Sequence, residues 1–367
     1  MTQHETPTST ERPVAPIVDG AVSTMDLHLI EASEDRRIAA DVDRDLEERL
    51  EAFEAFFESE IGDTNLTRAR NFEREFGVRQ LYLKFEGSNA TGTQKDRISF
   101  AQAMDALRRG YDTLTTASCG NYGVALTFAA KCAGLRCVVY VPHTYRPNRL
   151  AEIESLGATI VREGNDYENS VVASRARAER DGLYDANPGG ANTILQLSAY
   201  QQIAYEIYDE LRDAPAIVAV PVSNGTTLAG IWKGFVSLHR RGKISRLPRM
   251  VAGSSFGKNP IVQSSILGLA ECADLDPSKV RESRVNEPLI NWHSSDGDWA
   301  LHAIRESQGW AAYATDKAMR SYARLVRERE GLMVMPAATA GLVALVEGRA
   351  EPFPGDRYVA VLTGRRS

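Results

Sequence analysis

Strand-like and helix-like segments alternate along this chain from about residue 80 onward. Apolar, strand-like runs occur at residues 136–141, 159–161 and 216–222, and a helical pattern extends from Pro147 to Leu156. Because parallel strands need a crossover between them, such alternation predicts a parallel α/β architecture. With 367 residues, 43% of them hydrophobic, the chain fits two lobes better than one compact domain.

Composition excludes several classes of partner. The net charge is −6 and no block of Lys or Arg stands out, so we expect neither nucleic acid nor an anionic membrane as a partner. The four cysteines show no metal-ligand spacing, which predicts neither a disulfide framework nor a metal site. Without an apolar stretch of about 18 residues or an apolar leader, the chain is expected to be cytoplasmic.

The first 60 residues carry two further patterns. Residues 1–24 are rich in Thr, Pro, Ser and Glu and are expected to form a disordered tail. Residues 41–60 have the pattern of an acidic amphipathic helix. We expect this helix to pack on its own lobe, and contact with a partner chain is the alternative.

Lys95 is the most informative residue of the chain. It ends a polar loop that contains Gly87 and Gly92, between a strand pattern at residues 80–85 and a helical pattern that runs to Leu107. The positive end of a helix dipole, or partial burial, lowers the pKa of an amine and makes it a better nucleophile. On this segment alone, a solvated surface lysine is the alternative.

The segment resembles the lysine motif of the threonine synthase and tryptophan synthase β family, the fold-type II pyridoxal phosphate (PLP) enzymes. Their usual form is Glu-x-x-Asn-Pro-Thr-Gly-Ser-Phe-Lys-Asp-Arg. The chain matches it at Glu86, Asn89, Thr91, Gly92, Lys95, Asp96 and Arg97, and departs from it at Ala90, Thr93 and Gln94. Three further motifs follow in the family's order, so the resemblance covers roughly residues 60–365.

The first of these motifs, at residues 117–123, is similar to the family's Ser-x-Gly-Asn loop. The resemblance implies that Asn121 reaches the 3′-oxygen of the cofactor and that the substrate carboxylate lies against Ser118, Cys119, Gly120 and Tyr122. A helix N-terminus here suits an anion on physical grounds. An ordinary polar turn is the alternative.

The second motif follows the strand pattern at residues 216–222. Backbone amides, hydroxyls and a helix dipole predict a cradle for the cofactor phosphate, formed by Ser223, Asn224, Gly225, Thr226 and Thr227. The stretch resembles the threonine synthase sequence Pro-Val-Gly-Asn-x-Gly-Asn. Ser223 replaces a Gly of that sequence, which leaves the path of the loop open.

The third motif is a strand pattern at residues 358–362 followed by Thr363. The resemblance implies that this hydroxyl faces the pyridine nitrogen. A neutral partner leaves the cofactor a milder electron sink, suited to elimination and replacement. Met335 stands where relatives carry Glu, so acid–base details of the family do not transfer.

Together, the motifs imply a two-lobed fold-type II enzyme with parallel sheets flanked by helices and PLP in the cleft between the lobes. The expected large PLP-binding domain comprises residues 25–95 and 212–367, and the small α/β domain residues 96–211. Lys95 would hold the cofactor as a Schiff base and later act as general base. We also expect a homodimer.

The expected reaction is a threonine synthase-like β- or γ-elimination or replacement on an L-amino acid. A β-replacement synthase of the cysteine or diaminopropionate type is the second candidate, and a non-catalytic PLP-binding protein the third. In the family segment Asn-Ser-x-Asn-Pro-x-Arg, which binds the substrate phosphate, Asp185 replaces the Ser and Gly190 replaces the Arg. Elsewhere, Tyr122 stands where the family has a small hydroxyl residue, and its ring would take up space in the site. A substrate other than O-phosphohomoserine is therefore expected, unless Arg146 or Arg149 supplies the missing charge.

Overall fold

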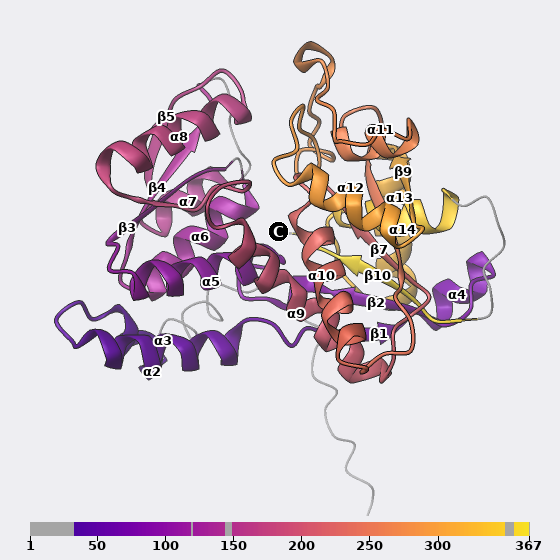
Figure 1. The fold of residues 1–367 in the computed structure, drawn as a ribbon, viewed down its shortest axis with the longest axis horizontal. Coiled ribbons are helices and arrows are strands. Elements are labelled where there is room, and N and C mark those ends of the chain that lie inside the picture. Colours follow the sequence, from indigo (N-terminus) through magenta and orange to yellow (C-terminus); the bar gives the residue numbers. More distant parts are fainter. Residues whose placement is uncertain (1–32, 119, 144–148, 349–355, 367) are drawn as a thin grey trace, which may run out of the picture.

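The structure, a computed structural model, describes residues 33–118, 120–143, 149–348 and 356–366. The tail expected at residues 1–24 lies outside this part. Two lobes each contain a sheet flanked by helices (Figure 1), which confirms the expected α/β class. The larger sheet has the order β1-β2-β10-β7-β8-β9, and only β1 is antiparallel to its neighbour; the smaller sheet, of order β5-β4-β3-β6, is parallel throughout.

The strands of the larger sheet are β1 (Leu66–Arg68), β2 (Leu81–Phe85), β7 (Ile217–Pro221), β8 (Arg249–Ser255), β9 (Trp310–Ala314) and β10 (Tyr358–Leu362). Those of the smaller sheet are β3 (Thr113–Ala117), β4 (Arg136–Val141), β5 (Thr159–Arg162) and β6 (Tyr184–Asp185). Short 3₁₀ turns are η1 (Glu86–Ser88), η2 (Pro277–Lys279) and η3 (Pro336–Thr339). The α-helices are α2 (Glu34–Ala40), α3 (Leu46–Glu60), α4 (Arg70–Phe76), α5 (Lys95–Arg108), α6 (Asn121–Cys132), α7 (Leu150–Ser155), α8 (Tyr167–Asp181), α9 (Thr193–Leu211), α10 (Thr226–Arg240), α11 (Pro260–Ile266), α12 (Gly297–Glu306), α13 (Asp316–Glu330) and α14 (Ala340–Glu347).

Helices cover both faces of the larger sheet, as the apolar strand β7 illustrates. Val218 and Val220 belong to the core cluster that includes α10 and α12, whereas Ile217 and Ala219 belong to the cluster that includes α13 and α14. Successive side chains of a strand point to opposite faces, so a strand covered on both sides must be apolar throughout. This explains why β7 reads as an uninterrupted apolar run.

The two lobes meet along α9, which packs on α10 of the larger lobe and on α5 of the smaller one (Figure 1). The acidic helix expected at residues 41–60 is α3, and it packs within the chain through Phe53 and Phe56, whose rings lie against Phe100 of α5. Residues 34–60 therefore lie with the smaller lobe. The expected division, which placed residues 25–95 in the large domain, does not follow this packing.

None of the helices in the described ranges combines the length and the apolar character needed to cross a membrane.

Candidate active site

A cavity of about 700 Å³ opens where the strands of both sheets end. Its walls come from the start of α5, the β3–α6 loop, the β7–α10 loop and the residue after β10. Carboxyl ends of parallel strands are where open α/β sheets bind ligands. The residues predicted from sequence that line it are Lys95, Ser118, Gly120, Asn121, Tyr122, Ser223, Asn224, Gly225, Thr226, Thr227 and Thr363. Cys119 lies outside the described residues, and Asp185 is not among the lining residues.

Lys95 is the first residue of α5 and lines this cavity. Burial lowers the pKa of its amine to about 8, although the charge of Asp296 opposes the shift. The amine nitrogen lies 5.4 Å from the centre of the Tyr122 ring. A substantial fraction of this amine is therefore neutral near pH 8, as both a nucleophile and a base require.

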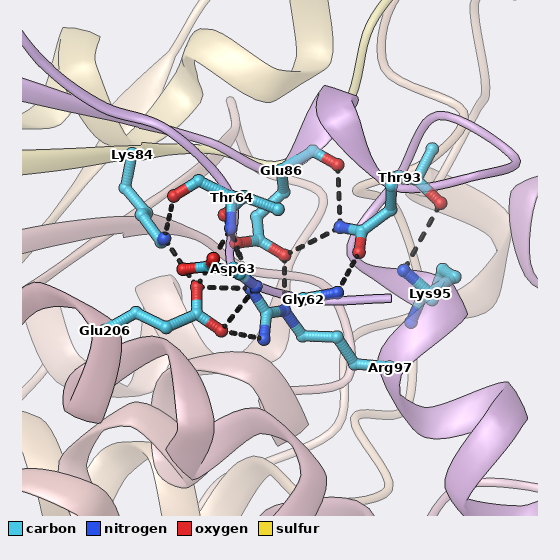
Figure 2. A network of polar contacts seen from close by, with 10 residues as sticks. Gly62, Asp63, Thr64, Lys84, Glu86, Thr93, Lys95, Arg97 and Glu206 are labelled. Carbon is cyan, nitrogen blue, oxygen red and sulfur yellow. Dashed lines mark hydrogen bonds and ion pairs between the residues drawn. The ribbon is translucent and has the colours of Figure 1, made fainter. Parts of the chain in front are cut away.

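A buried network of ionised side chains anchors the start of α5 (Figure 2). The guanidinium of Arg97 donates to the carboxylates of Glu86 and Glu206, each at 2.6 Å. Lys84 of β2 pairs with Glu206 as well, so the network joins β2, α5 and α9. Burial favours the neutral form of Glu206, but Arg97 and Lys84 outweigh it and lower its pKa to about 2. Lys95 thus lies two residues before Arg97, whose side chain is held in place by Glu86 and Glu206.

The β3–α6 loop presents donors to the cavity. The hydroxyl oxygen of Ser118 accepts the backbone N–H groups of Gly123, at 2.7 Å, and Gly120, at 3.3 Å. With both lone pairs used, the hydroxyl hydrogen is the group that Ser118 can still offer, and it has no acceptor within the described part of the chain. The N–H groups of Asn121 and Tyr122 also lack intrahelical acceptors, because they lie in the first turn of α6. Together these donors can bind a carboxylate.

The β7–α10 loop forms a second set of donors. Gly225 caps α10 with a φ of 95°, in the left-handed region. The backbone N–H groups of Thr226, Thr227 and Leu228 then point along the start of the helix without intrahelical acceptors, and all three residues line the cavity. Three convergent N–H groups at the positive end of a helix dipole suit the terminal oxygens of a phosphate.

Asp296 modifies this cradle and was not predicted from the sequence. Its carboxylate accepts the hydroxyl of Thr226, and its backbone N–H donates to the carbonyl of Asn224 at 3.0 Å. Burial raises the pKa of this carboxyl. The Thr226 hydroxyl is therefore engaged, and the cradle can offer the amide of Thr226 rather than its hydroxyl.

Arg149 and Met335 lie beside Asn121. Arg149 donates to the side-chain oxygen of Asn121 at 3.0 Å and forms a two-pronged pair with Glu152 at 2.7 Å. The sulfur of Met335 lies 3.8 Å from the side-chain nitrogen of Asn121. Of the two arginines that could supply the missing charge, Arg146 lies outside the described residues. Arg149 lines the cavity, and its charge is already paired with Glu152.

Asp185 and Tyr122 are turned away from direct polar contact with a ligand. The carboxylate of Asp185 accepts the backbone and side-chain N–H groups of Asn187, at 3.0 and 2.7 Å, and pairs with Arg175 at 3.4 Å. The hydroxyl of Tyr122 donates to the carbonyl of Ala186, so only its ring faces Lys95.

Comparisons with known proteins agree with this geometry. Residues 57–364 match the family described as "Pyridoxal-phosphate dependent enzyme". A threonine synthase of Methanocaldococcus jannaschii is 29% identical over 83% of this chain and 74% of its own, and one of Mycobacterium leprae is 30% identical over 78% and 76%. A crystal structure of a pyridoxal 5′-phosphate-dependent aspartate racemase superposes with a TM-score of 0.71 at 21% identity, over 87% of this chain and 94% of the other. The chain belongs to the pyridoxal-phosphate dependent enzyme family, has the fold-type II architecture, and its cofactor is PLP.

The residues of the cavity fit this cofactor. The α10 amides suit the phosphate, Lys95 provides an amine of lowered pKa, and Thr363 lines the same cavity from the end of β10. Among the described residues there is no group of His, Cys, Asp and Glu side chains arranged to hold a metal ion.

Gly225→Ala should weaken PLP binding by about tenfold or more and also lower stability. An alanine at a φ of 95° is strained by about 1 kcal/mol. Its Cβ would also lie 2.8 Å from the carbonyl oxygen of Asp296 and 2.9 Å from Cβ of Ala300, so α12 and the cradle must move apart. PLP titration of the apo-protein and urea unfolding measure the two effects.

Gly242→Ala is the matched control. Gly242 is also left-handed, with a φ of 66°, but nothing lies within 4 Å of a Cβ built there. We expect it to cost about 1 kcal/mol of stability and to leave PLP affinity within twofold. Equal effects of both substitutions on PLP affinity would show that the cradle is not sensitive to the spacing between Gly225 and Asp296.

Proposed function

We propose that this PLP-dependent enzyme catalyses a threonine synthase-like elimination or replacement at the β- or γ-carbon of an L-amino acid. The observation that carries the proposal is the position of Lys95, whose amine shares one cavity with the α10 cradle and with Thr363. The names of the relatives at 29–30% identity also support it. A β-replacement of the cysteine or diaminopropionate synthase type remains the second candidate.

The chain's own residues would hold the cofactor at both ends. The first-turn amides of α10 are proposed to bind the phosphate, and Asn121, which lines the same cavity, is the proposed partner of the 3′-oxygen. Thr363 is the proposed partner of the ring nitrogen. When bound, PLP supplies an electron-accepting ring that stabilises negative charge at the substrate's α-carbon. Since a hydroxyl keeps the ring nitrogen neutral, this stabilisation is moderate.

Lys95 is the proposed base for the α-proton. An amine with a pKa of about 8 can take a proton at Nζ near neutral pH and return it in a later step. Tyr122 is a poor competitor for this task, because burial raises the pKa of its phenol and its hydroxyl is bound to Ala186. The Tyr122 ring instead lies beside the amine, with its centre 5.4 Å from Nζ.

The substrate carboxylate is proposed to bind at the start of α6. The hydroxyl hydrogen of Ser118 and the N–H groups of Asn121 and Tyr122 are the donors available there. A carboxylate bound there would hold the α-carbon near Lys95, which lines the same cavity.

The charge of the cavity favours a substrate other than O-phosphohomoserine. Among the described lining residues, four are cationic and four anionic: Lys95, Arg149, Arg281 and Arg284 against Asp166, Glu168, Glu282 and Glu287. Lys95 is committed to the cofactor, whose own phosphate adds negative charge, and Arg149 is paired with Glu152. A second phosphate dianion would therefore enter a cavity without surplus positive charge. Repulsion between the Asp185 carboxylate and a substrate phosphate does not contribute, because Asp185 is not a lining residue.

Steady-state kinetics with a substrate panel tests the proposal. We expect O-acetylated and free hydroxy amino acids to give at least tenfold higher kcat/KM than O-phospho-L-homoserine. A preference for O-phospho-L-homoserine with threonine as product would contradict the substrate assignment. Dependence on an added nucleophile with O-acetyl-L-serine would select the second candidate, and bound PLP without turnover of any amino acid would select the non-catalytic PLP-binding protein.

The homodimer and the cytoplasmic location stay predictions. Light scattering tests the first and cell fractionation the second.

A further inference from the structure

Gln196 is a fully buried residue of α9 that lines the cavity and that no sequence motif singled out. Its side-chain oxygen, Oε1, has no hydrogen-bond partner among the residues that the structure describes. A buried acceptor without a donor loses its hydrogen bonds to water and gains none in return, so native proteins rarely keep one without a reason.

The orientation of this amide is fixed by its surroundings. Its nitrogen, Nε2, donates to Oε1 of Gln102 at 3.0 Å and lies within reach of two backbone carbonyls, those of Asn187 at 3.2 Å and Ala186 at 3.4 Å. Exchanging Oε1 and Nε2 would turn an acceptor toward three acceptors. Among the described residues, Oε1 is therefore the polar atom of Gln196 that is left without a partner, in a residue that lines the cavity.

Gln196 belongs to the same wall as the reactive amine. Gln102, which accepts from Gln196, donates to the Tyr122 hydroxyl at 2.6 Å. The ring of that tyrosine lies 5.4 Å from Nζ of Lys95. A contiguous set of contacts thus joins the unpartnered acceptor of Gln196 to the amine of Lys95.

We infer that Gln196 determines specificity by accepting a hydrogen bond from the substrate's side chain. The inference rests on the proposed function and names its substrate class: an L-amino acid whose side chain carries an O–H or N–H donor, such as a hydroxyl, an amine or a carboxamide. A donor on the substrate would satisfy Oε1, whereas an apolar group would leave it unsatisfied. An anion that carries only acceptor atoms would place its lone pairs against those of Oε1 and be repelled. Sites built to bind a hydroxyl or amine discriminate strongly against analogues that lack it.

Binding of isosteric amino-acid pairs to the PLP-loaded enzyme tests the inference without requiring turnover. The pairs are L-serine with L-2-aminobutyrate, L-homoserine with L-norvaline, and L-asparagine with L-leucine. Titration is followed by the change in cofactor absorbance. In the wild type, we expect the donor-bearing member of at least one pair to bind about ten- to a hundredfold more tightly. In Gln196→Met, which keeps the volume but removes the acceptor, the preference should fall to threefold or less.

Gln102→Met is the matched control. It removes an amide from the same buried network, but Gln102 does not line the cavity, and the two carbonyls still orient Gln196. The preference for the donor should survive in this variant. No preference in any pair, or a preference that Gln196→Met leaves intact, would overturn the inference while binding of amino acids still supported the proposed function. If no amino acid changes the absorbance of the PLP-loaded enzyme, both fail together.

Discussion

Lys95→Ala should abolish turnover, with a fall of at least about 10³-fold, and should leave the fold intact. Without this amine, reduction with borohydride should fix no PLP on the α5 peptide in mass spectrometry, whereas the wild type should carry it on Lys95. The reason is that Lys95 is the lysine of the cavity wall, and its pKa of about 8 makes it reactive. Substantial activity in this variant, or PLP fixed on another lysine of the wild type, would refute the assignment.

A second substitution at this position should show that the functional amine lowers the stability of the apo-protein. Lys95→Met, which keeps the apolar stem of the side chain, should be more stable than the wild type at pH 7 by about 2 kcal/mol. Burial lowers the amine's pKa from 10.5 to about 8, so the folded state resists protonation. Water in the cavity offsets part of this penalty.

The sign of the pH dependence follows from that pKa. Below pH 8 both states of the wild type are protonated and the full penalty is present. Between about pH 8 and 10.5 the unfolded chain binds more protons than the folded one, so the stability of the wild type rises with pH. The advantage of Lys95→Met should therefore shrink across this window, as urea unfolding at several pH values would measure. The exposed Lys317→Met is the control and should show no such window.

The parts of the site that the sequence could predict lie in single loops at strand ends. The cradle at residues 223–227 begins two residues after β7, and Lys95 lies ten residues after β2, at the start of the next helix, so the strand–loop–helix pattern is enough to locate them. Their function also depends on spacing within one loop, which a sequence motif records directly. The alternation of elements likewise predicts two parallel sheets.

The parts that could not be predicted depend on contacts between distant segments. Gln196 reaches the cavity only because α9 packs on α10. Asp296 reaches the Thr226 hydroxyl of the cradle only because the segment before α12 folds over the β7–α10 loop. Asp185 shows the opposite case, since its place in the family segment that binds the substrate suggested ligand contact. Its local bonds to Asn187, and its pair with Arg175, hold the carboxylate away from the cavity. A pattern of residue types does not show that neighbouring side chains already bind this carboxylate.

The position of the N-terminal helices depends on contacts of the same kind. The phenylalanines of α3 predict an apolar face but not which surface covers it. They pack around Phe100, which lies on the helix that begins with Lys95, so the N-terminal helices join the smaller lobe. Sequence motifs do not show on which lobe these helices pack.

Arg97→Met should be the most destabilising single substitution in the network of Figure 2, with a loss of about 3–5 kcal/mol in the free energy of unfolding. Glu86 is completely buried, and its carboxylate accepts two N–H groups of Arg97 at 2.6 and 2.9 Å. Removing the guanidinium leaves that charge uncompensated in the interior, whereas Glu206 keeps Lys84. The partly exposed Arg68, which pairs with Glu73, offers the control, because Arg68→Met should cost less than about 1 kcal/mol.

Two further measurements separate the loss of charge pairing from the loss of packing. The double variant Arg97→Met with Glu86→Gln should recover part of the stability, since it removes the charge that Arg97 had compensated. Glu206, whose pKa is lowered to about 2, stabilises the wild type above pH 4.5, and this contribution is lost as the pH falls toward 2. The gap between wild type and Arg97→Met should therefore narrow over that range. A loss no larger than that of Arg68→Met would mean that the network contributes no more than a surface ion pair, and that the start of α5 is held by its apolar contacts instead.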